Sequence, residues 1–97
     1  MKRERSEEYW FAEYESRTDE GDVLRHDTGF FSSVDNAKKF LETYMRQVES
    51  GVPKFNAESA LDDIGVNLET TFHSSPLGYF YKWKLVNIEE ELDKKLK

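Results

Sequence analysis

The stretch from Ser33 to Gly51 constrains the fold of this chain more than any other. Its apolar residues recur at spacings of three and four, which is the period of a helix with one buried face. These residues are Val34, Ala37, Leu41, Tyr44 and Val48, with Phe40 and Met45 widening the stripe. Ser33 can cap the first turn, and Gly51 ahead of Pro53 is a stop signal. We therefore predict an amphipathic helix over 33–50 whose apolar stripe needs a partner surface.

Strands are the natural partners for this helix. Runs dense in aromatic and β-branched residues, several of them alternating with period two, predict strands. Such runs lie at 8–16, 23–31, 66–73 and 79–86. The residues between the first two runs and between the last two are typical of turns. The pattern therefore indicates two hairpins, one on each side of the long helix.

Two shorter helices complete the predicted order. Asn56 is a plausible cap for a helix at about 57–64, and Asn87 for a terminal helix at about 88–96. The order is then ββα-α-ββα. We predict an α+β fold, in which a four-stranded antiparallel sheet carries the 33–50 helix packed on one face.

The length and composition fit one domain. A chain of 97 residues is too short for two separate cores. Only 37% of the residues are apolar, but 14% are aromatic, and aromatic side chains bury a large area each. Residues 1–7 are charged and show no periodicity. We therefore predict a disordered tail at 1–7 and a single domain at 8–97.

The last two strands predict a hairpin with a defined register. A slip of one residue would turn Trp83 to the solvent side, so the apolar faces restrict the pairing. The predicted register sets Phe72 opposite Tyr79, Leu68 opposite Trp83 and Val66 opposite Leu85. It also sets Glu69 across from Lys82, an opposite-charge pair that supports the same alignment.

Residue types used for catalysis are scarce. The absence of cysteine removes thiol catalysis, disulfides and Cys-based zinc sites. His26 and His73 have no ligand spacing, so we interpret them as surface residues. Ser74 and Ser75 are better explained as turn residues than as nucleophiles. We therefore expect no enzymatic activity, no metal site and no cofactor.

The charge of the chain is negative and unevenly distributed. Fourteen basic residues against twenty acidic ones give a net charge of −6. Acids dominate between Glu13 and Asp27, and the stretch from Phe55 to Tyr81 has no Lys or Arg at all. A solvated surface that keeps a small protein in solution would have the same composition. If these acids are functional, they suit a basic partner and disfavour nucleic acid.

The leading hypothesis is a small acidic module that binds another protein, with a basic cleft as its target. It would act as an inhibitor or neutraliser, of the immunity, antitoxin or viral counter-defence type, by analogy of size and charge. The partner-binding residues that we predict are Asp19, Glu20, Asp22, Glu58, Asp62, Asp63 and Glu69.

Two alternatives remain open. Aromatic residues interleaved with lysines at 79–84 are typical of strands that bind single-stranded nucleic acid. By alternation, the solvent face of that strand would offer Phe80, Lys82 and Lys84, beside Thr71. These residues could equally be a protein contact patch. The third reading is a small-molecule sensor with an aromatic-lined pocket between helix and sheet.

Hydropathy and charge are the properties of the sequence that bear on cellular location and oligomeric state. No apolar run approaches the roughly 18 residues that span a membrane, and the basic start at 1–5 is not followed by the apolar core of a signal peptide. We expect a cytoplasmic protein with no membrane partner. An acidic sheet edge argues against strong self-pairing, so we expect a monomer or a weak dimer.

Overall fold

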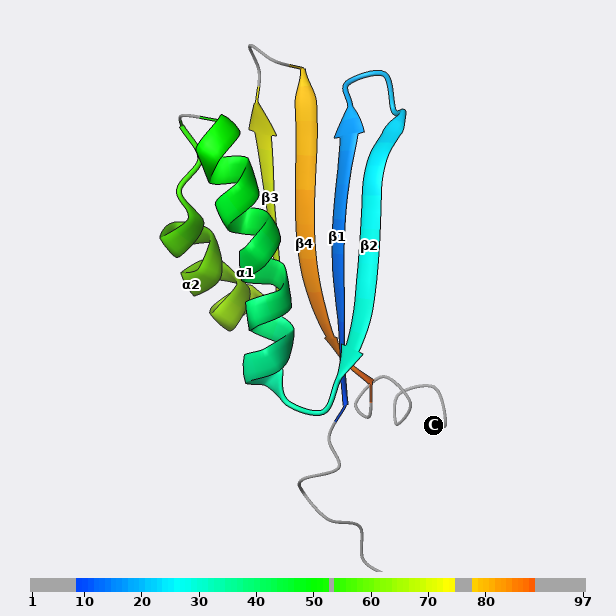
Figure 1. Ribbon diagram of the computed structural model, residues 1–97, viewed down its shortest axis with the longest axis vertical. Coiled ribbons are helices and arrows are strands. Elements are labelled where there is room, and N and C mark those ends of the chain that lie inside the picture. Colours follow the sequence, from blue (N-terminus) through cyan, green and yellow to red (C-terminus); the bar gives the residue numbers. More distant parts are fainter. Residues whose placement is uncertain (1–8, 53, 75–77, 89–97) are drawn as a thin grey trace, which may run out of the picture.

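Four antiparallel strands form one sheet, and two helices cover the same face of it (Figure 1). The structure is a computed structural model that describes residues 9–52, 54–74 and 78–88. The elements are β1 (Trp10–Thr18), β2 (Val23–Phe31), α1 (Val34–Gly51), α2 (Ala57–Asn67), β3 (Glu69–Ser74) and β4 (Tyr79–Asn87). The α+β prediction, with a four-stranded antiparallel sheet under the long helix, is confirmed.

The strand order is β2-β1-β4-β3, so the first and last strands of the chain form the centre of the sheet. Tyr14 of β1 lies opposite Trp83 of β4 in this central pair. Each hairpin adds one outer strand: β2 pairs only with β1, and β3 pairs only with β4. Both outer strands therefore have one edge that no other described strand covers.

Helix α1 forms where the apolar spacing predicts it. The Ser33 side chain accepts a hydrogen bond from the backbone N–H of Asn36 at 3.1 Å, which confirms the predicted cap. The N–H of Val52 closes the other end by donating to the carbonyl of Val48 at 2.7 Å. The buried face of the helix consists of Ala37, Leu41, Met45 and Val48.

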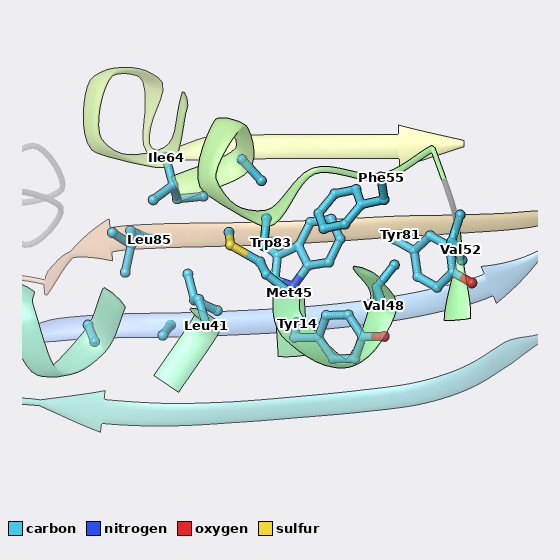
Figure 2. Close-up of a cluster of buried hydrophobic side chains, with 14 residues drawn as sticks. Tyr14, Leu41, Met45, Val48, Val52, Phe55, Ile64, Tyr81, Trp83 and Leu85 are labelled. Atoms are coloured by element: carbon cyan, nitrogen blue, oxygen red, sulfur yellow. The ribbon is translucent and has the colours of Figure 1, made fainter. Parts of the chain in front are cut away.

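The core lies between this face and the sheet (Figure 2). Trp83 is fully buried at its centre. The Phe55 ring stacks on it with 5.0 Å between centroids, and the Tyr14 ring lies 5.6 Å away on the neighbouring strand. Helix α2 contributes smaller apolar groups, of which Ile64 is fully buried. Both helices therefore depend on the same set of aromatic side chains.

The second helix is longer than predicted. Gly65 does not end it: α2 continues to Asn67, and Leu68 then takes a left-handed conformation with φ of 65°. The N–H of Leu68 donates to the carbonyl of Ile64 at 3.0 Å, which closes the helix in the way that a glycine normally would. Val66 consequently lies on the helix with 80% of its surface exposed, instead of facing inward on a strand.

The predicted register of the second hairpin is wrong by two residues. Phe72 lies opposite Tyr81, not Tyr79, and Thr70 lies opposite Trp83. A shift of two keeps every side chain on its predicted face, so the alternation of apolar residues could not detect it. Glu69 now faces Lys84 instead of Lys82. Because both residues are lysines, the charge argument could not distinguish the two registers either.

Some predictions fall outside the described residues. These are the tail at 1–7 and the terminal helix at 88–96, of which the structure describes only Ile88. No helix in the described ranges has the length and apolar composition needed to cross a membrane.

The assigned core predicts that replacing leucine by alanine lowers the free energy of unfolding by different amounts at two positions. Leu41 is fully buried, whereas Leu24 on β2 is 55% exposed. Leu41→Ala should lower the free energy of unfolding by about 2–5 kcal/mol, because it removes buried methyl groups and leaves a cavity. Leu24→Ala should change it by less than about 0.5 kcal/mol. Urea unfolding followed by tryptophan fluorescence measures both values, and equal effects would contradict the assigned core.

Buried tyrosines predict a loss of stability at alkaline pH. Burial raises the pKa of Tyr14, and also that of Tyr81, above the ordinary value of 10.0. The unfolded chain then loses these protons first, so stability is complete below pH 10 and falls as the pH rises beyond it. Tyr14→Phe should reduce this decline while leaving the pH dependence below pH 9 unchanged. Urea unfolding from about pH 8 to 11 tests this expectation, and a decline equally steep in the variant would contradict it.

Candidate functional site

The seven predicted acidic residues do not form one surface. Asp19, Glu20 and Asp22 belong to the turn between β1 and β2, at the upper end of the sheet in Figure 1. The others lie on α2 and at the start of β3: Glu58, Asp62, Asp63 and Glu69. The sheet register separates the two groups, because Thr18 is level with Ser74 whereas Glu69 is level with Glu13. A partner would meet them as two separate sites.

The turn group has a structural explanation. The Asp19 carboxylate lies 2.7 Å from Nε2 of His73, which is at the end of β3. The backbone N–H of Asp19 donates to the carbonyl of Gly78 at 2.9 Å. These two contacts join the first hairpin to the end of the second one. Asp19 is therefore engaged within the fold, and Glu20 and Asp22 remain as exposed acids of that turn.

Three acids of the second group border a groove between α2 and the outer strand β3, whereas Glu58 is exposed in the first turn of α2 and lines no part of the groove. The groove has a volume of about 580 Å³, in the range of ligand sites. A hollow of about 450 Å³ adjoins it and shares Asp63, Asn67, Thr70 and Thr71. The groove is lined by Lys54, Phe55, Asn56, Ser59, Ala60, Asp62, Asp63, Val66, Asn67, Thr70, Thr71 and Phe72. Three of the predicted acids, counting Glu69 in the second hollow, meet here.

The walls of this groove follow from local structure. The side chain of Asn56 accepts a hydrogen bond from the N–H of Ser59 at 2.8 Å and starts α2. Ala57, Ala60 and Ile64 turn one side of the helix into the core. The opposite side then presents Asp62 to solvent beside β3. Asp63 accepts a hydrogen bond from the Asn67 side chain at 2.6 Å, so its carboxylate is held in position.

The groove combines negative charge with apolar surface. Its two hollows are lined by three carboxylates, those of Asp62, Asp63 and Glu69, and by one cation, Lys54. The apolar part consists of the exposed Val66 and of two rings, Phe55 and Phe72, which meet edge to face at 5.2 Å. Such a surface suits a ligand that carries both positive charge and apolar groups.

The second predicted patch lies on the sheet face that the helices leave open. Phe80, Lys82 and Lys84 alternate with the buried residues of β4, and Thr71 is the cross-strand neighbour of Lys82. The sheet thus brings the four residues together as expected. It also sets Glu13 and Glu15 of β1 beside them, which the sequence did not reveal, whereas Glu69 was expected next to a lysine.

Each lysine of this patch lies between partners on two other strands. Lys82 lies opposite Glu15 on β1, and Lys84 is flanked by Glu13 on β1 and Glu69 on β3. The side chain of Glu15 is only 11% exposed and pairs with Arg17 at 3.0 Å. Nucleic-acid phosphates would meet these carboxylates as well as the lysines. The local charge therefore argues against the nucleic-acid alternative.

Glu15 and Arg17 are charged residues of the open face that sequence reasoning missed, and Glu13 and His26 lie beside them. Glu13 and His26 form a contact of 2.7 Å between β1 and β2. The alternation along β1 assigns its two glutamates to one face. Only the pairing of β1 with β4, whose sequence separation is the longest in the sheet, places them beside the lysines. That pairing has no local signal in the sequence.

The remaining alternatives find less support in the packing. Over most of α1, buried side chains such as Trp83, Leu41 and Met45 fill the space between the helix and the sheet. At the C-terminal end of α1, however, a hollow of about 270 Å³ is lined by Tyr14, Tyr79 and Tyr81 together with residues of the helix end. The sensor alternative therefore keeps a small candidate pocket there. Among the described residues, no group of three or more His, Cys, Asp or Glu could hold a metal ion.

Comparison with protein-family models, with curated proteins and with solved structures finds no match for this chain.

The charge pattern of the open face predicts weak binding to single-stranded DNA. A labelled thymidine oligomer of about twelve nucleotides should show no saturable binding at about 50 mM salt. Glu13→Gln combined with Glu69→Gln should raise the affinity, because the carboxylates on both sides of Lys84 become neutral. Fluorescence anisotropy measures both. Saturable wild-type binding that K82A/K84A abolishes would contradict this expectation and support the nucleic-acid alternative.

Proposed function

We propose that this protein is a small acidic binding module that docks on a basic surface of another protein. The observation that supports this most is the groove between α2 and β3. Three predicted partner-binding acids, Asp62, Asp63 and Glu69, border two adjoining solvent-open hollows, and apolar side chains line the larger one. The exposed Val66 lies outside the core, and an exposed apolar side chain among acids is typical of a recognition site.

Two physical effects would serve binding at this site. The net charge of −6 and the acidic groove attract a basic partner and speed encounter at low ionic strength. The exposed Val66 and the partly buried Phe72 supply apolar area that loses water on contact. Charge would steer the partner, and burial of apolar area would then hold it.

The proposal extends to an inhibitory role. A small rigid domain that fills a basic cleft, such as the nucleic-acid channel of an enzyme, blocks that cleft without chemistry of its own. We therefore propose a neutraliser of the immunity, antitoxin or viral counter-defence type, acting in the cytoplasm as a monomer or weak dimer. The argument for this role is one of size and charge, and it rests on the docking proposal.

Capture with two matched variants tests the docking proposal. The groove variant is D62N/D63N/E69Q. The comparison variant E20Q/D22N/D35N removes the same charge from exposed acids outside the groove, including two acids of the predicted turn group, so the pair of variants tests which group binds. Tagged wild type and both variants capture proteins from a lysate of the source organism, followed by mass spectrometry. We expect one partner that wild type and the comparison variant retain and that the groove variant loses.

The affinity of that partner is then measured by titration calorimetry at several salt concentrations. Salt should weaken the wild-type complex, and the groove variant should bind at least about tenfold more weakly. A partner that the groove variant retains, or that only the comparison variant loses, would overturn the assignment of the groove. Circular dichroism of all three proteins confirms that the substitutions leave the fold intact.

A further inference from the structure

The free edge of β3 faces the groove. The N–H of Leu85 on β4 donates to the carbonyl of Leu68 at 2.8 Å, so the residue directly before β3 is bonded towards β4. Backbone groups alternate in direction along an antiparallel strand. Those of Glu69, Thr71 and His73 therefore point away from β4. No described strand pairs with them, so this edge carries unpaired donors and acceptors.

The groove and the adjoining hollow lie beside residues 69–72 of this edge. Thr70, Thr71 and Phe72 form its strand side, and Asp62, Asp63 and Val66 of α2 form its helix side. An extended chain lying beside β3 would complete its backbone hydrogen bonds on one side. Its side chains would reach the acids and the apolar surface of α2. The hollow thus combines the edge of β3, which can form backbone hydrogen bonds, with a surface of α2 that can select the side chains of a bound segment.

The two outer strands differ in how well they are protected. Charged side chains, bulges and proline normally shield an exposed edge. β2 carries Arg25, His26 and Asp27 in succession, and its pairing with β1 contains a bulge near Arg17. β3 carries Glu69 and His73 near its ends, but its middle residues, Thr70, Thr71 and Phe72, are uncharged, and its pairing with β4 has no bulge. β3 is therefore the edge that offers regular pairing to a new strand.

We infer that β3 accepts an extended basic segment of a partner protein as a fifth strand of the sheet. This inference rests on the proposed function, because it names the part of the partner that the groove takes. The segment carries Lys or Arg among apolar residues. Its side chains on the helix side meet Asp62 and Asp63 through cations and Val66 and Phe72 through apolar groups, and a cation on the other side meets Glu69.

Charge selects this occupant over a second copy of the chain. Pairing two copies through β3 would bring two acidic grooves together, each with three carboxylates against one lysine. Like charges in that arrangement repel, and each copy carries −6 overall. A basic segment instead neutralises the groove while it pairs with the strand.

A synthetic peptide provides the test. The probe is a labelled peptide of about eight residues in which pairs of lysine and pairs of valine alternate, so that each face of the strand carries both residue types, and its length spans β3. The first control has the same sequence with every backbone nitrogen methylated, which keeps the charge but removes the donors. The second control has glutamate in place of each lysine. Fluorescence anisotropy with the full chain at low salt measures binding of all three.

The lysine–valine peptide should bind at least about tenfold more tightly than its methylated form, and the glutamate–valine peptide should not bind. In ¹H–¹⁵N spectra, the amides of Glu69, Thr71 and His73 should shift and gain protection from exchange, while those of β2 stay unchanged. Thr71→Pro removes an outward N–H at an edge position that tolerates proline, and should abolish binding. Should this variant not fold, the methylated peptide and the spectra still decide the outcome.

Equal binding of the two lysine–valine peptides would overturn strand addition, and so would shifts confined to β2. A dimer in sedimentation at the same protein concentration, competed by the peptide, would show that a second copy occupies the edge and would overturn the stated occupant. None of these results depends on the capture experiment. If the groove variant loses its partner while the peptide does not bind, the proposed function stands and only the strand inference fails.

Discussion

The packing of Trp83 against its aromatic neighbours is the interaction on which the rest of the structure depends. This residue lies on the last strand and meets Tyr14 of the first strand at 5.6 Å between ring centroids. Phe55, from the connection between the helices, stacks on it at 5.0 Å. The contacts therefore join three distant parts of the chain around one buried ring. In a domain of 97 residues with 37% apolar residues, aromatic area of this kind replaces a larger aliphatic core.

This arrangement also determines where a partner can bind. β1 and β4 each pair with a strand on both sides, so among the described strands only β2 and β3 have an unpaired edge. The core attaches α2 through Ala57, Ala60 and Ile64, and the helix then holds its acidic side beside β3. Core packing thus sets the position of the groove, and the acids that give it its charge lie outside the core. Binding and stability are separable here, because neutralising Asp62 removes no buried contact.

The open sheet face shows why charge in a sequence is a poor guide to charge on a surface. Phe80, Lys82 and Lys84 resemble a nucleic-acid platform along β4 alone. The neighbouring strands set Glu13, Glu15 and Glu69 beside them, so positive and negative side chains are neighbours across this face. The histidines illustrate the same point, since His26 and His73 each contact a carboxylate on another element at 2.7 Å. Cross-strand neighbours decided the electrostatics in each case.

The sequence by itself determined the elements whose signals are local. The stripe from Val34 to Val48, the caps at Ser33 and Asn56, and the alternation around Trp83 were all readable, because each depends on residues within a few positions of one another. Tertiary structure alone decided the hairpin register, since two registers keep the same faces and offer equivalent lysines to Glu69. It also decided the end of α2 and the juxtaposition of that helix with the edge of β3. These features depend on contacts between distant segments, and such contacts leave no periodic trace in the chain. Helix α1 thus supplies much of the core, while the candidate site lies on the shorter helix α2 beside it.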